Sequence, residues 1–484
     1  MRRVKKWGLQ MKQRDFTQGK IFGPMFSFVI PIILTNLLQT MYGIADNIIV
    51  GKFSGDELAL AAVGTTGSIS ALVLNLVVGL AVGSGVVISQ AYGARDYEKV
   101  SRSIHTFLTF ALIFGLCVGA LAVILTPKLL LWTGVQEVLM SRATLYLRII
   151  FLGYPATAVY NYAAAALRAV GDSKTSLRIL GLSGLLNVGL NLIFVFVFHM
   201  SVGGVALATA ISKYASVISI LVIMYKRRDE IYHFSPAKMG IHKKELVEML
   251  RFGLPSGIQN SMFSVSNIFF TVALNSLDTY VLSAKTIAMN LTNVANNVSS
   301  SYMNATTTFC AQNYGARRFE RIGKSLGICL LQGTAFTFLV GILMYLLIGP
   351  ISTLYISASD PLRELIIECS RSIAAVTLPW YWLCSVMNAT SGALRGVGAS
   401  TIPMVTSITG ICLYRILWIL FVFPLESFHN ARGIYIGFPT SWTLVILANA
   451  VALFFVFRKI KVKFAREKAA EKASIFEEAM ETKA

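Results

Sequence analysis

The chain has 484 residues, of which 55% are hydrophobic and only 14% are charged, and its formal net charge is +20. Soluble domains carry about 25% charged residues, so this composition excludes an ordinary soluble globular protein and indicates an integral membrane protein. The basic residues gather at the ends of apolar segments, which favours contact with a membrane surface and argues against a nucleic acid partner.

Long apolar blocks predict helices that cross the bilayer. As helices, blocks of about 20 residues or more span a hydrocarbon core of about 30 Å. Segments such as ALVLNLVVGLAVGSGVVI lack the alternation of polar and apolar residues that a barrel strand requires. We predict twelve spanning helices, over residues 25–50, 57–91, 104–126, 138–166, 177–199, 202–225, 252–274, 280–312, 325–348, 362–393, 401–424 and 432–457.

The longest polar gap divides these helices into two sets of six. The expected organisation is a basic cytoplasmic N-terminus (1–24), an N-terminal six-helix bundle (25–225), a cytoplasmic linker (226–251), a C-terminal six-helix bundle (252–457) and a charged cytoplasmic tail (458–484). Most of the 43 lysines and arginines lie in the two termini and in the gaps after even-numbered spans. This distribution predicts a multi-pass protein of the plasma or inner membrane with both termini in the cytoplasm.

Short phrases recur in both halves in the same order. QAYGARDYEKV begins at Gln90, and QNYGARRFERI begins at Gln312, 222 positions later. ALRAVGDS (166–173) and ALRGVGAS (393–400) lie 227 positions apart. The chain therefore reads as two copies of one six-helix unit, and because six is even, both copies have the same topology.

Two similar bundles predict a transport mechanism. With a central cavity between the bundles, rocking one against the other exposes that cavity to each side of the membrane in turn. The repeated Gly-Ala-Arg and Leu-Arg-x-Val-Gly phrases are expected to supply a tight turn and a basic anchor at the inner surface of each half. We therefore interpret them as structural rather than substrate-binding.

The chain resembles the MATE family of multidrug and toxic compound extrusion transporters, of the prokaryotic type. The resemblance covers all twelve spans and rests on IPIILTNLLQTMYGIADNIIVG, QAYGARDYEKV, ALRAVGDSKTS and YRILWILFVFP. It implies a V-shaped pair of lobes and secondary active efflux of amphipathic, cationic organic compounds by alternating access. It implies exchange for H⁺ or Na⁺, with no other cofactor and no enzymatic activity.

Asp46 is the only acidic residue deep within a predicted span. An ionisable group in hydrocarbon costs at least about 2.5–3.5 kcal/mol on insertion scales, so this residue is a functional candidate by default. The family resemblance implies that this aspartate helps to bind the coupling cation and changes its protonation. The alternative is a boundary residue near the outer end of span one.

Two asparagines and a threonine are the candidate partners of Asp46. Asn187 and Asn191 are four residues apart in span five and share a helix face. By the resemblance they look like the remnant of a family cation site, in which the second position is often an aspartate and Thr209 of span six adds an oxygen. Such oxygen ligands suit Na⁺, and no structural metal is expected. The alternative is hydrogen bonding between helices, which is common for asparagine in membranes.

Lys213 lies in the middle of span six, one turn after Thr209. In one interpretation its ammonium pairs with Asp46 or with the two asparagines, and the transport cycle runs on protons rather than Na⁺. In the other, the side chain snorkels to an aqueous edge. Both interpretations stay open at the level of the sequence.

Polar and flexible side chains in both halves predict a wet substrate cavity. Methionines offer adaptable apolar contact, although each polar residue taken alone fits helix packing equally well. Lys285, near the outer start of span eight, is expected at the solvated rim. The candidate cavity residues are Asn36, Gln39, Tyr42, Asn161, Gln259, Asn260, Met262, Met289, Asn290, Asn388 and Arg415.

The competing function is a flippase for a lipid-linked saccharide or a related amphiphile. It predicts a larger, strongly cationic cavity, whereas Asp46 and the few cavity cations favour the exporter. The sequence contains no Walker loop, H-E-x-x-H or G-x-S-x-G motif, which argues against an enzyme and against an ATP-driven pump. The expected partners are a small organic substrate and the lipid bilayer, with the protein as a monomer.

Overall fold

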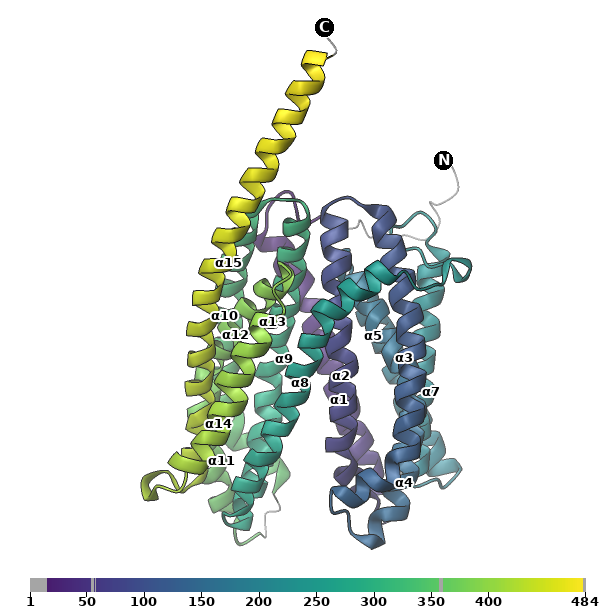
Figure 1. Cartoon of the computed structure of the whole chain (residues 1–484). Coiled ribbons are helices and arrows are strands. Elements are labelled where there is room, and N and C mark those ends of the chain that lie inside the picture. The colour runs from purple at the N-terminus through teal and green to yellow at the C-terminus, as the bar shows by residue number, and fades with distance from the viewer. Residues whose placement is uncertain (1–14, 54–55, 57, 357–359, 482–484) are drawn as a thin grey trace. The chain divides into compact units, whose positions relative to one another are not determined.

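The computed structural model describes residues 15–53, 56, 58–356 and 360–481, whose path is shown in Figure 1. Helices make up almost all of this part of the chain, and no strand occurs within it. The all-α class of integral membrane protein that the composition predicts is therefore confirmed. Helices suit these apolar segments because each satisfies its own backbone hydrogen bonds in lipid.

The elements follow the chain in a simple order. The first half contains α1 (Phe22–Phe53), α2 (Ala59–Gly93), α3 (Tyr97–Trp132), α4 (Glu137–Leu152), α5 (Tyr154–Ala169), α6 (Lys174–Leu192), the π-helix η1 (Ile193–Val197) and α7 (Val202–Lys226). The 3₁₀ turn η2 (Pro236–Lys238) follows. The second half contains α8 (Lys243–Asn275), α9 (Thr279–Gly315), α10 (Phe319–Tyr355), α11 (Arg363–Thr377), the 3₁₀ turn η3 (Leu378–Trp380), α12 (Tyr381–Gly396), α13 (Thr401–Ser407), the π-helix η4 (Ile408–Leu413), α14 (Tyr414–Leu417), the π-helix η5 (Trp418–Val422), the 3₁₀ turn η6 (Glu426–Phe428) and α15 (Ala431–Glu481).

Each of the twelve predicted spans coincides with one helix or with an interrupted run of helices. Eight stretches of the described chain are long and apolar enough to cross a membrane, and they correspond to spans one, two, three, five, six, nine, eleven and twelve. Spans seven and eight are the long helices α8 and α9, whose many Asn, Ser and Thr residues lower their hydropathy. Spans four and ten fall short because each is broken into two shorter helices.

The two breaks occur at equivalent places in the repeat. Span four ends one helix at Leu152 and starts the next at Tyr154, and Pro155 follows directly. Span ten is interrupted by the turn η3, which contains a proline 224 positions after Pro155. Proline has no backbone N–H and disfavours a helix that continues through it. The same backbone irregularity is thus built into both copies.

The repeated inner turns also share one geometry. Arg95 and Arg317 both adopt a left-handed conformation, with φ of 61° and 53°, and the N–H of the next residue bonds a carbonyl five residues back in each copy. Gly171 and Gly398 are left-handed as well, with φ of 89° and 87°. A glycine tolerates this conformation without strain, which explains why Gly occupies the same place in both Leu-Arg-x-Val-Gly phrases.

The described chain forms two compact units. The first unit contains Met1–Val63 and Ala91–Leu246, and the second contains Gly64–Gln90 and Val247–Ala484. Most of α2 therefore belongs to the second unit, although it is the second helix of the first half. Gln90 is the last residue of this segment. Its Nε2 donates a hydrogen bond to the Gly396 carbonyl at 2.8 Å.

Two glycine pairs bring α2 and α8 into close contact within the second unit. The sequence Gly-x-x-x-Gly occurs in α2 at Gly79 and Gly83 and in α8 at Gly253 and Gly257. A Cβ added at Gly83 would lie 2.4 Å from the Gly253 nitrogen, and one added at Gly79 would lie 2.3 Å from the Gly257 Cα. Small residues at this spacing let two membrane helices approach backbone to backbone.

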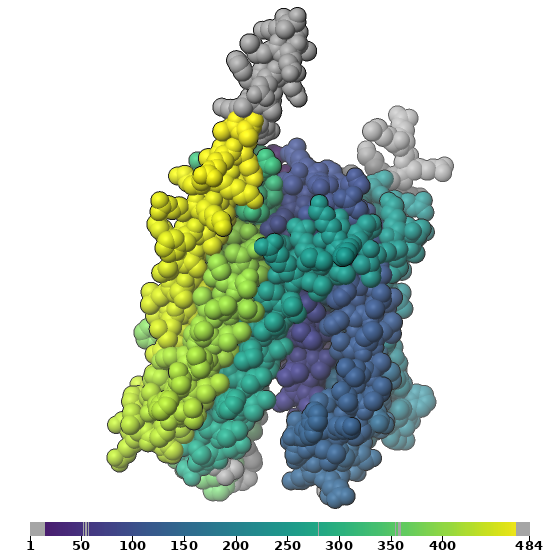
Figure 2. Space-filling view, in the orientation of Figure 1, coloured from purple at the N-terminus to yellow at the C-terminus, as the bar shows by residue number. Residues whose placement is uncertain are grey.

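The second unit carries the longest helix of the described chain. The helix α15 has 51 residues, and Figure 1 shows it continuing, in yellow, well past the end of α10 beside it. Its apolar part, Ala431–Ala470, is a candidate span. On the face shown in Figure 2, α13 and α15 lie side by side at the surface of this unit.

An ion pair ties the connection between α1 and α2 to other parts of the first unit. Arg142 Nε on α4 lies 2.6 Å from Asp56 Oδ2, and the Ser201 hydroxyl donates to the same oxygen at 3.3 Å. The hydrogen bond from Arg142 is the main reason why the pKa of Asp56 lies below its usual value of 3.8. This pair lies outside the apolar part of the spans, where water screens it.

We predict that Gly83→Leu destabilises the protein by about 1–3 kcal/mol, because the new side chain meets backbone atoms of α8 that cannot move aside. Thermal unfolding in detergent measures the loss. Gly67→Leu is the matched control, because a Cβ at Gly67 has open space around it. Equal melting temperatures for the two variants would contradict the close contact.

We also predict that Asp56→Asn lowers the melting temperature at pH 7. A depressed pKa means that the carboxylate stabilises the fold above its usual pKa, and this stabilisation disappears as the pH falls through the lower pKa of the folded state. The wild type and the variant are therefore expected to converge as the pH falls below the folded-state pKa of Asp56. A difference that persists unchanged in acid would show that the ion pair is not its cause.

Candidate functional site

Asp46 lies at the centre of a hydrogen-bonded cluster in the first unit. Asn191 Nδ2 on α6 donates to Asp46 Oδ1 at 2.5 Å, and the Thr209 hydroxyl on α7 donates to Asp46 Oδ2 at 3.2 Å. Both carboxylate oxygens are thus held by a neutral donor. The structure brings together residues from three helices that the sequence separates by up to 163 positions.

The second asparagine completes this cluster. Asn187 Nδ2 donates to the Thr209 hydroxyl at 3.3 Å, and Asn191 Nδ2 lies 3.4 Å from Asn187 Oδ1. Both asparagines are buried, with exposed fractions of 5% and 0%. Asn191 Oδ1 is also buried and has no hydrogen-bond partner in the described chain. A buried acceptor without a donor is costly, so this oxygen is suited to accept a hydrogen bond from a ligand or to bind a cation.

The contact between α1 and α6 fixes the position of Asp46. Tyr42 lies one turn before Asp46, and its hydroxyl is within 3.4 Å of the Leu180 and Gly181 carbonyls on α6. Its ring fills the space beside Gly184, where a Cβ would lie 1.7 Å from the ring. Residues four apart share a helix face, so the tyrosine that anchors α1 also turns Asp46 toward α6.

Lys213 of α7 packs its side chain beside the break in span four. Its Cδ packs beside Gly153, at 3.5 Å from the position of an added Cβ, and its Nζ lies 5.6 Å from the centre of the Tyr154 ring. Its charge interacts with that of Asp46, but no direct ion pair joins them among the residues described. A role for Lys213 in the ion cycle therefore stays a prediction.

The other candidates of the first half do not gather around this cluster. On α1, the exposed Gln39 lies one turn before Tyr42, and the half-buried Asn36 lies two turns before it. Asn161 donates to the carbonyl of Thr157 within α5 at 2.8 Å. Their place in a substrate cavity stays a prediction.

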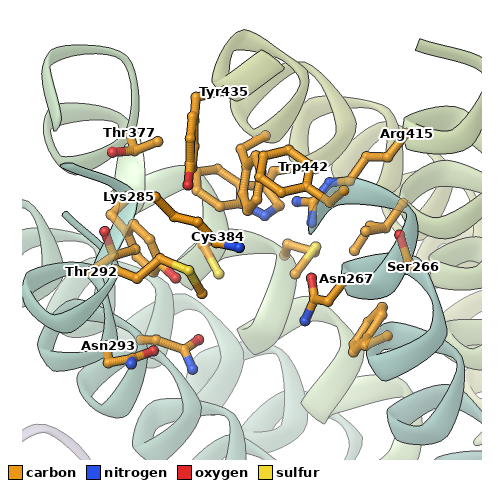
Figure 3. Close-up of a pocket in the computed structure, with 18 of the residues that line it drawn as sticks. Ser266, Asn267, Lys285, Thr292, Asn293, Thr377, Cys384, Arg415, Tyr435 and Trp442 are labelled. Atoms are coloured by element: carbon orange, nitrogen blue, oxygen red, sulfur yellow. The ribbon is translucent and has the colours of Figure 1, made fainter. Parts of the chain in front are cut away.

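The second unit contains a pocket of about 300 Å³, shown in Figure 3. Three of the predicted cavity residues, Met289, Asn388 and Arg415, line it. The half-buried Lys285 lines it too. In Figure 3, Lys285 and Arg415 enter from opposite sides.

The remaining candidates of the second half lie outside the lining of this pocket. Gln259 is buried, donates to the Ser407 hydroxyl at 2.9 Å and accepts from Arg395 at 2.7 Å. Asn290 lies 3.5 Å from the Tyr355 hydroxyl. The half-buried Asn260 and Met262 lie on α8.

Sequence reasoning missed two features of the second unit. Arg395, expected as an anchor at the membrane surface, is buried with an exposed fraction of 2% and bonds Gln259. The aromatic wall of the pocket was also missed. The sequence contains a pattern that predicts this wall, since Tyr435, Phe438 and Trp442 recur at the spacing of one face of α15.

Comparison with known proteins decides the family. The MatE family model matches residues 31–193 and matches again over residues 255–420. The chain belongs to the MatE family. Two matches of one family model in one chain confirm that the two halves of this MatE protein are copies of one unit.

Similar proteins support the same assignment. The MatE protein is 25% identical to the probable multidrug resistance protein YoeA of Bacillus subtilis, over 92% of this chain and 96% of the relative. It is also 25% identical to the probable multidrug resistance protein NorM of Thermotoga maritima, over 81% of this chain and 83% of the relative. A solved multidrug resistance MATE family transporter of the MOP superfamily has the same fold, with a TM-score of 0.84, 21% identity and coverage of 93% and 99%.

Family membership makes this MatE protein a multi-pass membrane transporter and not an enzyme. The Asp46 cluster and the pocket of the second unit each have the chemistry for a different partner. The cluster offers a carboxylate, amide oxygens and a hydroxyl, whereas the pocket offers cations and aromatic rings.

We predict a coupling energy of about 1.5–3 kcal/mol between Asp46 and Asn191 in this MatE protein, because a hydrogen bond to a charged acceptor is stronger than a neutral one. A double-mutant cycle of Asp46→Ala and Asn191→Ala, read from the free energy of unfolding in detergent, measures it. The control cycle pairs Asp46→Ala with Asn47→Ala, since Asn47 is exposed. Additive effects in both cycles would show that the contact contributes nothing.

Proposed function

We propose that this protein is a secondary active exporter of amphipathic organic compounds, driven by exchange for H⁺ or Na⁺ through alternating access. The observation that carries the proposal is Asp46, a carboxylate within a membrane helix that is held by Asn191 and Thr209. The relatives named as multidrug resistance proteins support export as the direction of transport. The basic termini support a cytoplasmic location for both ends.

The Asp46 cluster has the properties that coupling requires. Asn191 and Thr209 donate hydrogen bonds that favour the ionised carboxylate, and these residues connect α1 to α6 and α7. A proton or a bound cation neutralises the carboxylate and removes the reason for these donors to point at it. Contacts between the three helices therefore depend on the ion, and a conformational change needs such a difference in binding between two states.

The identity of the ion depends on two opposing features. The available ligands are all oxygens, from Asp46, Asn187, Asn191 and Thr209, and oxygen ligands favour a hard ion such as Na⁺. The Lys213 ammonium nearby repels a second cation and favours a proton, which can bind Asp46 directly.

The charged residues of the two units indicate which substrate charge each unit attracts. Asp46 is the feature of the first unit that would attract an organic cation. The pocket of the second unit has no acidic residue in its described lining, so it adds no attraction of that kind. The flippase alternative gains no support from this pocket, because two cations in about 300 Å³ fall short of the large, strongly cationic cavity that a lipid-linked saccharide requires.

We predict that Asp46→Asn reduces ion-driven export by about tenfold or more, because its amide neither takes up a proton nor neutralises Na⁺. Efflux of a panel of cationic dyes from proteoliposomes, under imposed Na⁺ or H⁺ gradients, measures the loss. Asp229→Asn is the control, since this acid is exposed in the linker. Wild-type gradient dependence in Asp46→Asn would rule out the coupling site.

The variant Lys213→Gln separates the two ions in the same assay. If the Lys213 charge favours the proton over Na⁺, then removing this charge is expected to increase export driven by the Na⁺ gradient relative to export driven by the H⁺ gradient. An unchanged ratio of the two responses would exclude a role for Lys213 in ion choice.

A further inference from the structure

The pocket of the second unit and the Asp46 cluster occupy equivalent places in the two copies. The two family-model matches begin 224 positions apart and end 227 positions apart. The helices α6 and α13 begin 227 positions apart, so Arg415 corresponds to Val188, which lies between Asn187 and Asn191. The helices α7 and α15 begin 229 positions apart, so Thr209 corresponds to Phe438 of the pocket. One duplicated site thus holds an acid in the first unit and cations in the second.

Arg415 carries a buried charge that no acidic residue compensates within the described part of the chain. Its exposed fraction is 9%, its Nε donates to the Ser441 hydroxyl at 3.1 Å, and its guanidinium carbon lies 3.7 Å from the centre of the Phe438 ring. Both partners are neutral. The titratable groups that act electrostatically on Arg415 are Tyr381, Cys384 and Cys412, which are also uncharged at neutral pH.

The terminal nitrogens of Arg415 remain available to a ligand. Ser441 bonds only Nε, and no other hydrogen bond to this guanidinium is found in the described part of the chain. A guanidinium offers two parallel N–H donors that match the two oxygens of a carboxylate. Placing a charge inside a membrane protein is costly, and an anion in the pocket offsets that cost.

Lys285 adds a second cation on the opposite side of the pocket. Its Nζ donates to the Thr271 hydroxyl at 3.0 Å, another neutral partner. The described lining contains no aspartate or glutamate. Both cations therefore favour an anionic ligand over the cationic one that the family resemblance implies.

The wall of the pocket is aromatic. Phe270 contacts Tyr435 and Phe438 edge to face, with ring centres 5.0 Å apart in each pair, and Tyr381 contacts Trp442 at 4.9 Å. These rings line the pocket beside the guanidinium, and Phe438 is the least buried of them. A volume of about 300 Å³ is at the lower end of ligand pockets, which suits one small aromatic group.

We propose that the pocket of the second unit binds an amphipathic aromatic carboxylate. Its carboxylate bonds the terminal nitrogens of Arg415, its ring lies against the aromatic wall, and Lys285 strengthens the attraction from the other side. The proposal rests on the proposed function in that it takes this pocket as part of the route of an exported compound. It extends that function by assigning anionic aromatic compounds as a substrate class.

Calorimetric titration of the purified full chain in lipid nanodiscs tests the proposal without any ion gradient. The probes are 2-naphthoate, the neutral 2-naphthamide and the cationic 2-naphthylmethylammonium. We expect 2-naphthoate to bind about tenfold or more tightly than the other two, because only it pairs with the guanidinium. Equal affinity for the three probes, or a preference for the cation, would overturn the proposal.

Substitutions of Arg415 and Lys285 test whether these two residues bind 2-naphthoate. Arg415→Gln is expected to weaken 2-naphthoate binding about tenfold and to leave 2-naphthamide binding unchanged, and Lys285→Gln is expected to have a smaller effect in the same direction. Arg432→Gln is the control, because Arg432 is an exposed cation on α15. Should Arg415→Gln fail to fold, Arg415→Lys keeps the charge but loses the paired donors, and it is expected to bind more weakly than the wild type. Undiminished 2-naphthoate binding in the folded variants would show that Arg415 and Phe438 only support the fold.

Asp46→Asn distinguishes this proposal from the proposed function. Because Asp46 lies outside the pocket, this variant is expected to bind 2-naphthoate like the wild type while it loses ion-driven export. Retained export in Asp46→Asn would count against the coupling site alone. Lost 2-naphthoate binding in Asp46→Asn would contradict the assignment of the ligand to this pocket.

Discussion

The placement of one carboxylate within a membrane helix is the constraint on which the first unit depends. Lipid cannot solvate Asp46, so its oxygens need donors from within the protein, and Asn191 and Thr209 supply them. These hydrogen bonds form only if α1, α6 and α7 keep a fixed rotation and a fixed position along their axes relative to one another. Tyr42 fixes that register from one turn away through its contacts with α6. Helix packing and ion chemistry are thus parts of one arrangement in this unit.

Duplication followed by a change of charge explains the contrast between the two units. Both copies keep the broken fourth span, the left-handed inner turns and a π-helix near the end of the fifth span, so the backbone has changed little. The side chains at the duplicated site have changed much more. In the first unit Asn191 faces a carboxylate, and in the second unit Arg415 faces Ser441 and aromatic rings. One repeated backbone therefore carries an acid in the first unit and cations in the second.

The sequence predicts the spans well because hydropathy is a property of each segment alone. Hydropathy does not show the break at Gly153, since the residues on both sides are apolar, and only Pro155 signals it. Asp46, Asn187, Asn191 and Thr209 could be grouped from helix spacing together with the family resemblance. The partners of Arg415 could not, because Ser441 lies 26 residues away on another helix and only the folded chain brings the two together. The burial of Arg395 was missed for the same reason.

The unbroken course of α15 has a mechanical consequence. At about 1.5 Å per residue, its 51 residues measure about 76 Å, more than twice the roughly 30 Å of the hydrocarbon core. The part beyond the core continues the twelfth span as one helix. A tilt of about 10° within the membrane would displace the far end of a 40 Å arm by about 7 Å. A fluorophore near that end would convert small rotations of the second unit into easily detected displacements.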